Sequence, residues 1–332
     1  MTGERILVTG GMGFIGTAVV KRLAKHNRVT VVDRLDFGSS PEVQPLVDVG
    51  TVELVTWDLA DVGEIHRRIG GGDFGAVVHL AALTHIPLCE AYPDFAYRSN
   101  VVASLNVIAH LPQGCRFINV STSSTYAPED RPHREDESAL LPIDFYGLTK
   151  KHVEELAQYY ARSKGLGIVN VRLANAAGFG ETNPKLIGTI LQQVHSGASL
   201  VELGNLTPRR DFIHIDDIAW VIGELLRVWP AAGGQIESFN IATGFDPVSV
   251  AELFELIVKA IGRDVEVRSV PARRRGQDQE RQLLYPDPSK LKALLPSFSP
   301  KSIEQWLPAV ARDPGLRLNP RLESQIARAC GP

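Results

Sequence analysis

The sequence is poor in cysteine and has no long hydrophobic run. Its 332 residues include three cysteines, Cys89, Cys115 and Cys330, which are odd in number and widely spaced. They predict neither a disulfide framework nor a CxxC metal or redox pair. No apolar run approaches the roughly 18 residues of a membrane span, and residues 1–10 lack the basic start and apolar stretch of a signal peptide. We therefore expect a soluble, cytoplasmic protein with no bound metal and no membrane partner.

An excess of one charge sign is also absent. The chain has 35 Lys and Arg against 38 Asp and Glu, which gives a formal net charge of −3. This balance disfavours nucleic acid and anionic membrane surfaces as partners. With 44% hydrophobic and 22% charged residues, the composition is that of an ordinary globular protein. The length suits one large domain or two domains that share an interface.

Short β-branched runs alternate with amphipathic stretches in the N-terminal half. This alternation predicts an α/β fold with a doubly wound parallel sheet that helices cover on both faces. The expected strands are Arg5–Thr9, Arg28–Asp33, Thr51–Trp57, Ala76–Leu80, Cys115–Val120 and Gly167–Leu173. The expected helices are Gly13–His26, Asp94–Leu111 and Asp144–Ser163.

The alternation stops near Asn175, and Gly, Asn, Pro and Arg then interrupt the chain more often. The elements expected beyond this point are the helices Leu186–His195 and Ile215–Trp229 and the strand Ser238–Ile241, which could return to the main sheet. We expect residues 1–174 plus about 211–243 to form a dinucleotide-binding domain. Residues from about 175 to 210 plus 244–332 would form a smaller α/β substrate domain.

A glycine-rich turn follows the first predicted strand and opens the first predicted helix. Gly10, Gly13 and Gly16 leave the backbone bare where a dinucleotide pyrophosphate meets the positive end of the helix. Asp33 ends the second strand, where a carboxylate accepts hydrogen bonds from ribose hydroxyls and repels a 2′-phosphate. Asp33 therefore favours NAD over NADP, whereas the adjacent Arg34 could accommodate a 2′-phosphate.

Tyr146 and Lys150 lie four residues apart at the start of a predicted helix, so they share one helical face. A free tyrosine titrates near 10, but a neighbouring ammonium and a nicotinamide cation favour the phenolate. The pair can therefore act in proton transfer at neutral pH. An exposed tyrosine beside a solvated lysine is the alternative interpretation. Thr122, at the end of the preceding strand, makes the combination more specific because its hydroxyl can bridge substrate and phenol.

The sequence resembles the extended short-chain dehydrogenase/reductase family, in particular its nucleotide-sugar epimerases, dehydratases and reductases. The motifs that carry the resemblance follow one another along nearly the whole chain. They are Gly10 to Gly16, Asp58-Leu59, His79 to Ala82, Asn100-Val101, Ser121 to Tyr126, Tyr146 to Lys150, Arg172 to Asn175, Arg210 to Asp217, Phe239 to Ile241 and Asp287 to Lys290.

The resemblance implies a Rossmann fold that binds NAD, and it implies a set of site residues. Thr122, Tyr146 and Lys150 match the family's catalytic trio. The cofactor contacts implied are Gly10, Gly13, Phe14, Ile15, Gly16, Asp33, Asp58, Leu59, Ala81, Ala82, Asn100, Tyr146 and Lys150. The substrate contacts implied are Thr84, Ser123, Ser124, Asn175, Arg210 and Arg274.

Two departures from the family pattern affect the interpretation. Ser123 and Ser124 follow Thr122, where the family's sugar 4,6-dehydratases carry an acidic pair or at least a glutamate. Two serines cannot supply the acid and base that removal of water requires, so dehydration is disfavoured. The family's Arg-Pro-Gly-Asp is here Arg274-Arg275-Gly276-Gln277. Arg275 could therefore share the phosphate-binding role of Arg274, or the arginine run could be a solvated loop.

The function expected from the resemblance is that of an NAD-dependent nucleotide-sugar epimerase, acting at C4 through a transient keto-sugar. The partner is then a nucleotide-diphosphate sugar, and a homodimer is expected. A nucleotide-sugar 4-ketoreductase that uses NAD(P)H would employ the same trio but exchange its cofactor each turnover. A catalytically silent NAD-binding regulator is the third hypothesis, which the retained Tyr146 and Lys150 disfavour.

Overall fold

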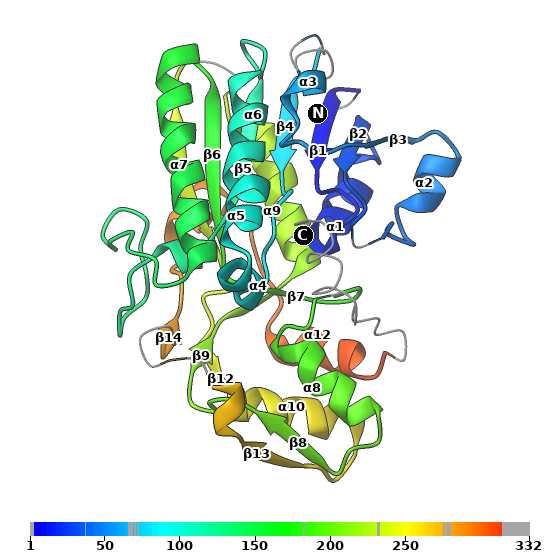
Figure 1. The fold of residues 1–332 in the computed structure, drawn as a ribbon, viewed down its shortest axis with the longest axis vertical. Coiled ribbons are helices and arrows are strands. Elements are labelled where there is room, and N and C mark those ends of the chain that lie inside the picture. Colours follow the sequence, from blue (N-terminus) through cyan, green and yellow to red (C-terminus); the bar gives the residue numbers. More distant parts are fainter. Residues whose placement is uncertain are drawn as a thin grey trace.

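Within the described part of the chain, seven parallel strands form one sheet (Figure 1). The computed structural model describes residues 3–36, 38–65, 69, 71, 73–181, 183–230, 233–274, 276 and 280–313. The strands are β1 (Arg5–Thr9), β2 (Arg28–Asp33), β3 (Val52–Thr56), β4 (Ala76–His79), β5 (Arg116–Thr122), β6 (Gly167–Leu173) and β11 (Ile236–Ile241). Their order is β11-β6-β5-β4-β1-β2-β3. The chain therefore winds from β1 to one edge and then from β4 to the other, which confirms the predicted doubly wound α/β fold.

Helices cover both faces of the sheet. Because successive side chains of a strand point to opposite faces, each strand contributes to two hydrophobic clusters. In β1, Ile6 and Val8 belong to a buried cluster with α1 and α9, whereas Leu7 packs on the other face with α6 and α7. Strands buried on both sides need apolar residues at every position, which explains the continuous β-branched runs. The helices are α1 (Phe14–Leu23), α6 (Ala103–Ala109), α7 (Phe145–Lys164) and α9 (Ile215–Val228).

The structure differs from the prediction at the helix expected over Asp94–Leu111. This segment contains α5 (Pro93–Tyr97), a π-helical turn at Arg98–Val102 and then α6. The π-turn brings Asn100 inward, where its side chain bonds the backbone N–H and C=O of Leu83 at 2.7 and 3.0 Å. A π-bulge of this kind inserts one residue into a helix and often marks a functional site.

A smaller group of elements packs at the lower end of the molecule in Figure 1. These elements have their own buried cluster, which includes Ile190, Val201, Ile257 and Trp306. They are β7 (Asn175–Ala177), α8 (Leu186–His195), β8 (Leu200–Leu203), β10 (Phe212–His214), α10 (Val250–Ile261), β13 (Glu266–Ser269) and α12 (Ile303–Ala311). β10 pairs in parallel with β7, and β13 pairs in parallel with β8. None of the helices in the described ranges is long and apolar enough to cross a membrane.

Candidate active site

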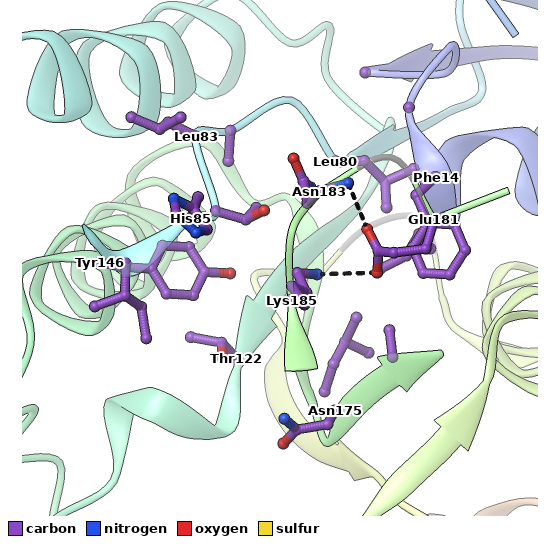
Figure 2. Close-up of a pocket in the computed structure, with 18 of the residues that line it drawn as sticks. Phe14, Leu80, Leu83, His85, Thr122, Tyr146, Asn175, Glu181, Asn183 and Lys185 are labelled. Carbon is purple, nitrogen blue, oxygen red and sulfur yellow. Dashed lines mark hydrogen bonds and ion pairs between the residues drawn. The ribbon is translucent and has the colours of Figure 1, made fainter. Parts of the chain in front are cut away.

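A cavity of about 790 Å³ lies along the carboxyl ends of the strands and extends to the smaller group of elements (Figure 2). The crevice at this edge of a doubly wound sheet is where such folds bind ligands. The site residues expected from the sequence line this cavity, with the exceptions of Asn100 and Arg274. The structure therefore brings together the glycine turn, the Thr-Tyr-Lys trio and Arg210.

The glycine turn leaves room for a ligand at the start of α1. Gly10 has a φ of +69°, and a Cβ there would lie 2.7 Å from the backbone nitrogen of Ala81. A Cβ at Gly16 would lie 2.1 Å from the carbonyl oxygen of Gly10, so both positions require glycine. Gly13 is the N-cap of α1 and provides no side-chain cap, and the first turn contains no acidic residue. This open helix end fits a pyrophosphate.

Asp33 lies where the expected adenosine ribose would bind. Its Oδ2 accepts a hydrogen bond from the Met12 N–H at 3.0 Å, and its Oδ1 accepts one from the Leu35 N–H at 2.9 Å. Burial raises the pKa of Asp33, and these two backbone hydrogen bonds oppose the shift. Leu35 has a φ of +61°, and among the described residues it alone combines a side chain with a positive φ. Strain at such a position often marks a functional site.

Arg34 is held by acidic residues around it. Its Nη2 lies 2.6 Å from Asp36 Oδ2, and its Nη1 lies 3.5 Å from Asp58 Oδ2. The guanidinium also lies over the Phe95 ring, 5.1 Å from the ring centre. These contacts occupy the group that the sequence offered to a 2′-phosphate. The local charge therefore fits NAD better than NADP.

The trio lies where α7 passes the end of β5. The Tyr146 hydroxyl points into the cavity, and the Thr122 side chain lies beside it (Figure 2). Lys150 is 2% exposed and its Nζ donates to the carbonyl oxygen of Val120 at 2.8 Å. Asp144 caps the helix by accepting from the Gly147 N–H at 2.7 Å, which fixes the first turn of α7.

Burial decides the protonation of Tyr146 in the chain without a cofactor. Burial raises the pKa of Tyr146 above its ordinary value, Cys89 raises it further, and the Thr122 side chain opposes the shift. Lys150 itself is desolvated, and burial lowers its pKa to about 8. The chain alone therefore keeps Tyr146 protonated at neutral pH. The expectation that Lys150 and a bound nicotinamide cation together favour the phenolate stays a prediction.

Hydroxyl and amide groups surround the part of the cavity beside Tyr146. Ser123 and Ser124 form a buried 3₁₀ turn after β5, and the Ser124 N–H donates to Thr122 Oγ1 at 3.2 Å. Thr84 and Asn175 also line this part. The nearby Asp144 carboxylate lies 3.9 Å from the Arg281 guanidinium. Arg281 was not anticipated from the sequence, because 155 residues separate it from the Tyr126 carbonyl oxygen to which it donates.

Arg210 and Arg274 are placed differently. Arg210 lines the cavity, and its Nη2 donates to the carbonyl oxygen of Arg281 at 2.7 Å. Arg274 is exposed and lies outside the lining, because its guanidinium donates to Ser269 Oγ at 3.0 Å. Arg273 takes a position in the lining instead. The sequence could not predict which of the two arginines faces the cavity, because side chains of adjacent loop residues have no regular direction. Arg275 lies outside the described residues.

Asn100 has an internal role in this structure. It is 1% exposed, and its Nδ2 donates to Thr149 Oγ1 at 3.0 Å as well as to the Leu83 carbonyl. Asn100 therefore joins the π-turn to the loop after β4 and to α7. Glu181 and Lys185 are further lining residues that sequence analysis missed; they form an ion pair at 3.7 Å in the loop before α8 (Figure 2).

Comparisons with known proteins agree with this geometry. The model of the NAD dependent epimerase/dehydratase family matches residues 6–242. The dTDP-glucose 4,6-dehydratase of Streptomyces niveus is 30% identical over 308 residues, which cover 90% of this chain and 88% of that protein. UDP-arabinose 4-epimerase 1 of Arabidopsis thaliana is 28% identical over 316 residues, which cover 86% of this chain and 73% of that protein.

Solved structures show the same fold. The dTDP-glucose 4,6-dehydratase DesIV of Streptomyces venezuelae, solved with NAD bound, has a TM-score of 0.81 at 25% identity and covers 93% of this chain and 96% of its own. The matched family region contains the glycine turn, Asp33 and the Thr122-Tyr146-Lys150 trio. The resemblance to extended short-chain dehydrogenases is confirmed. NAD is the cofactor, and the chain belongs to the NAD dependent epimerase/dehydratase family.

Proposed function

We propose that this protein is an NAD-dependent nucleotide-sugar 4-epimerase. One observation carries the proposal: Thr122 and Tyr146 line one cavity, in which serines, rather than acids, follow Thr122. A proton-transfer pair without a second acid and base suits reversible oxidation at a carbinol carbon. Several relatives are named as UDP-sugar 4-epimerases, which supports a nucleotide sugar as substrate.

In the proposed reaction, Tyr146 removes the proton of the sugar 4-hydroxyl, and the neighbouring Thr122 hydroxyl relays it. NAD, held by the glycine turn and Asp33, would supply the acceptor for the C4 hydride and its donor to the other face of the keto-sugar. Tyr146 then gives the proton back to O4, so the product is the 4-epimer and no net oxidation occurs. Lys150, buried beside the phenol, holds the ribose of the cofactor and stabilises negative charge on Tyr146.

Groups along the cavity would hold the substrate. Thr84, Ser123, Ser124 and Asn175 offer hydroxyl and amide partners to the hexose. Arg210 offers a guanidinium for the diphosphate, where a planar fork matches phosphate oxygens. Because Arg273 lines the cavity and Arg274 does not, we assign the second phosphate contact to Arg273.

The test is a product analysis with UDP- and dTDP-hexoses, followed by NMR. We expect a pair of 4-epimers and no lasting accumulation of reduced nicotinamide, because the hydride returns to the carbon that lost it. A product that has lost water would replace the proposal with a 4,6-dehydratase. Stoichiometric consumption of NADPH or NADH with a 4-keto-sugar, and no epimerisation of any hexose, would replace it with a ketoreductase.

Three further features belong to the proposal. We place the protein in the cytoplasm, a reducing compartment that suits the free thiols Cys89 and Cys115. The domain division stays a prediction with two changes. Leu291, Leu295 and Phe298 pack in the cluster of the main sheet, so we assign 289–298 to the larger unit, and Phe212 of β10 packs in the cluster of the smaller one. A homodimer through α5, α6 and α7 remains a proposal, supported by the exposed Tyr97 and Tyr159 on these helices.

A further inference from the structure

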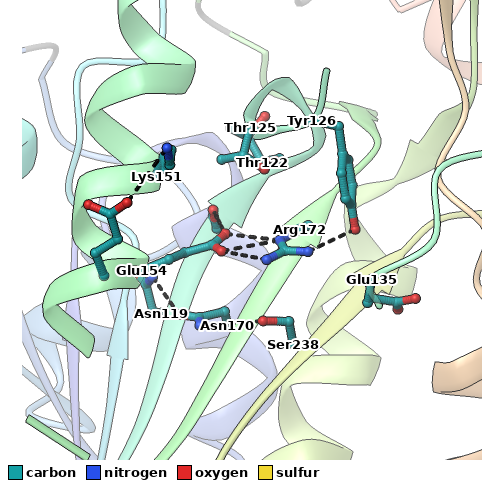
Figure 3. A network of polar contacts seen from close by, with 12 residues as sticks. Asn119, Thr122, Thr125, Tyr126, Glu135, Lys151, Glu154, Asn170, Arg172 and Ser238 are labelled. Atoms are coloured by element: carbon teal, nitrogen blue, oxygen red, sulfur yellow. Dashed lines mark hydrogen bonds and ion pairs between the residues drawn. The ribbon is translucent and has the colours of Figure 1, made fainter. Parts of the chain in front are cut away.

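A buried polar network of Glu154, Arg172 and Tyr126 joins α7 to the main sheet (Figure 3). Three consecutive residues of β5 lie against three residues of α7. The Val120 carbonyl accepts from Lys150 at 2.8 Å, Ser121 Oγ donates to Glu154 Oε1 at 2.5 Å, and Thr122 lies beside Tyr146. Glu154 is therefore attached to the same strand segment as the trio, one helical turn beyond Lys150.

The Glu154 carboxylate is 6% exposed and is bound on its other side by Arg172 of β6, which is 4% exposed. Arg172 Nε lies 3.1 and 3.2 Å from the two carboxylate oxygens, and Nη2 lies 2.7 Å from Oε2. The remaining guanidinium nitrogen donates to the Tyr126 hydroxyl at 3.0 Å, which in turn donates to Asn240 Oδ1 at 2.8 Å. Figure 3 shows Arg172 between Glu154 and Tyr126.

A buried ion pair is a weak source of stability, because desolvation offsets most of its Coulomb energy. We therefore expect the Glu154–Arg172 pair to act on Lys150, the buried ammonium on the same helix as Glu154. Burial lowers the pKa of Lys150 to about 8, and the first charged group that opposes the shift is Glu154. A carboxylate one helical turn from Lys150, bound to the same strand segment, thus favours the ammonium form that the phenol requires.

We propose that Glu154 is a positioning residue that keeps Lys150 cationic beneath Tyr146, and that Arg172 fixes the carboxylate and limits its field. The role rests on the proposed proton transfer by Tyr146 and Lys150. Glu154 is not one of the described residues that line the cavity. Its effect on the reaction therefore passes through Lys150.

Three other titratable side chains near this network stay neutral near pH 7, whereas Glu135 faces Arg172 on the side away from Lys150. From β4, burial lowers the pKa of His79 to about 3. From α4 (Ile86–Ala91), burial raises the pKa of Cys89 to about 12, and burial also raises the pKa of Tyr126 to about 12. Asp144 at the start of α7 is engaged by Gly147 N–H and Arg281. Glu154 and Arg172 are therefore the charged side chains that adjust Lys150 from below.

The test is ¹³C NMR of holoprotein labelled at lysine Cε, with the Lys150 signal identified as the one lost in Lys150→Met. In Glu154→Gln we expect the titration midpoint of Lys150 to fall by about one pH unit or more, because an ammonium without the neighbouring carboxylate loses its proton more easily. Glu155→Gln is the matched control. Its side chain is 58% exposed and pairs with Lys151 at 3.6 Å, so the midpoint should not move.

A second substitution, at Arg172, should change the Lys150 midpoint in a predictable direction. Glu154→Gln/Arg172→Gln removes both charges, leaves no unpaired buried ion, and should return the Lys150 midpoint partly toward the parent value. Equal midpoints in the parent and in folded Glu154→Gln would overturn the proposal, as would a double variant lower than the single one. If Glu154→Gln does not fold, a double-variant midpoint equal to the parent's would overturn it.

The NMR test needs no turnover, so it stands apart from the identity of the sugar reaction. Where epimerisation is found, the alkaline limb of the kcat profile should move to lower pH in Glu154→Gln with KM for the nucleotide sugar unchanged. A merely structural role would reduce stability and leave this limb in place. Absence of epimerisation together with a shifted Lys150 midpoint would refute the proposed function but retain the role of Glu154.

Discussion

At the scale of single residues, the burial of Tyr146 decides how the site is activated. Burial raises the pKa of its phenol, so the chain alone holds the proton at neutral pH. In the proposed reaction, the phenolate becomes available when a bound nicotinamide adds its positive charge to that of Lys150. Proton removal would then be coupled to cofactor binding.

The first prediction concerns this hydroxyl. Tyr146→Phe should lower turnover by about 100-fold or more, because the general acid/base is removed while the ring still fills its place. NAD binding, measured by calorimetry, should change little. A variant that keeps more than about a tenth of the parent rate would show that another group carries the proton.

The second prediction concerns cofactor choice at Arg34. In Asp36→Ala the guanidinium loses its partner at 2.6 Å and becomes available to a 2′-phosphate. Affinity for NADP should then rise about tenfold, a change of about 1.4 kcal/mol, with NAD affinity nearly constant. Asp36→Ala/Arg34→Ala is the control and should lose the gain. Unchanged NADP binding in the single variant would mean that Asp33 alone excludes the phosphate.

At the scale of elements, the local sequence pattern predicted those helices and strands whose bounds depend on residues nearby in the chain. β1, β2, β6 and α8 have the expected bounds, because their apolar periodicity and flanking breakers lie within one short window. The π-turn at Arg98–Val102 could not be predicted, since it follows from a contact between Asn100 and Leu83 across 17 positions. The Glu154–Arg172 pair escaped notice for the same reason, whereas the motif residues of the site share local spacings.

The third prediction tests that element-scale clamp. Asn100→Ala leaves the Leu83 N–H and C=O without the side chain that bonds them at 2.7 and 3.0 Å. The free energy of unfolding should fall by about 1–3 kcal/mol, the range for buried polar groups that lose their partner. Urea unfolding of NAD-free protein measures this loss. Asn106→Ala is the comparison variant. Asn106 lies in α6, and its side chain donates a buried hydrogen bond to the Leu59 carbonyl, so the substitution leaves the contacts of Leu83 in place.

At the scale of the whole molecule, the cavity joins two hydrophobic units that sequence analysis separated only by composition. The main sheet supplies the glycine turn and the trio, and the segments from β7 onward supply Asn175 and Arg210. Arg274 is bonded to Ser269 at the end of β13, and β13 pairs with β8, whose residues lie 66 positions earlier in the chain. Such long-range choices lie beyond periodicity and spacing.

The last prediction concerns assembly. Tyr97 and Tyr159 are 40% and 60% exposed on α5 and α7, and Tyr97 also contacts the His152 ring edge-on at 5.9 Å. Exposed aromatic rings on adjacent helices are typical of interface cores. Light scattering should therefore give a mass of two chains, and Tyr97→Glu/Tyr159→Glu should give one chain with its fold retained, because carboxylates are costly to bury between copies.

The control variant is Phe245→Glu. Phe245 is a comparably exposed aromatic away from these helices, so this variant should stay dimeric. A parent protein that is monomeric at micromolar concentration would refute the dimer.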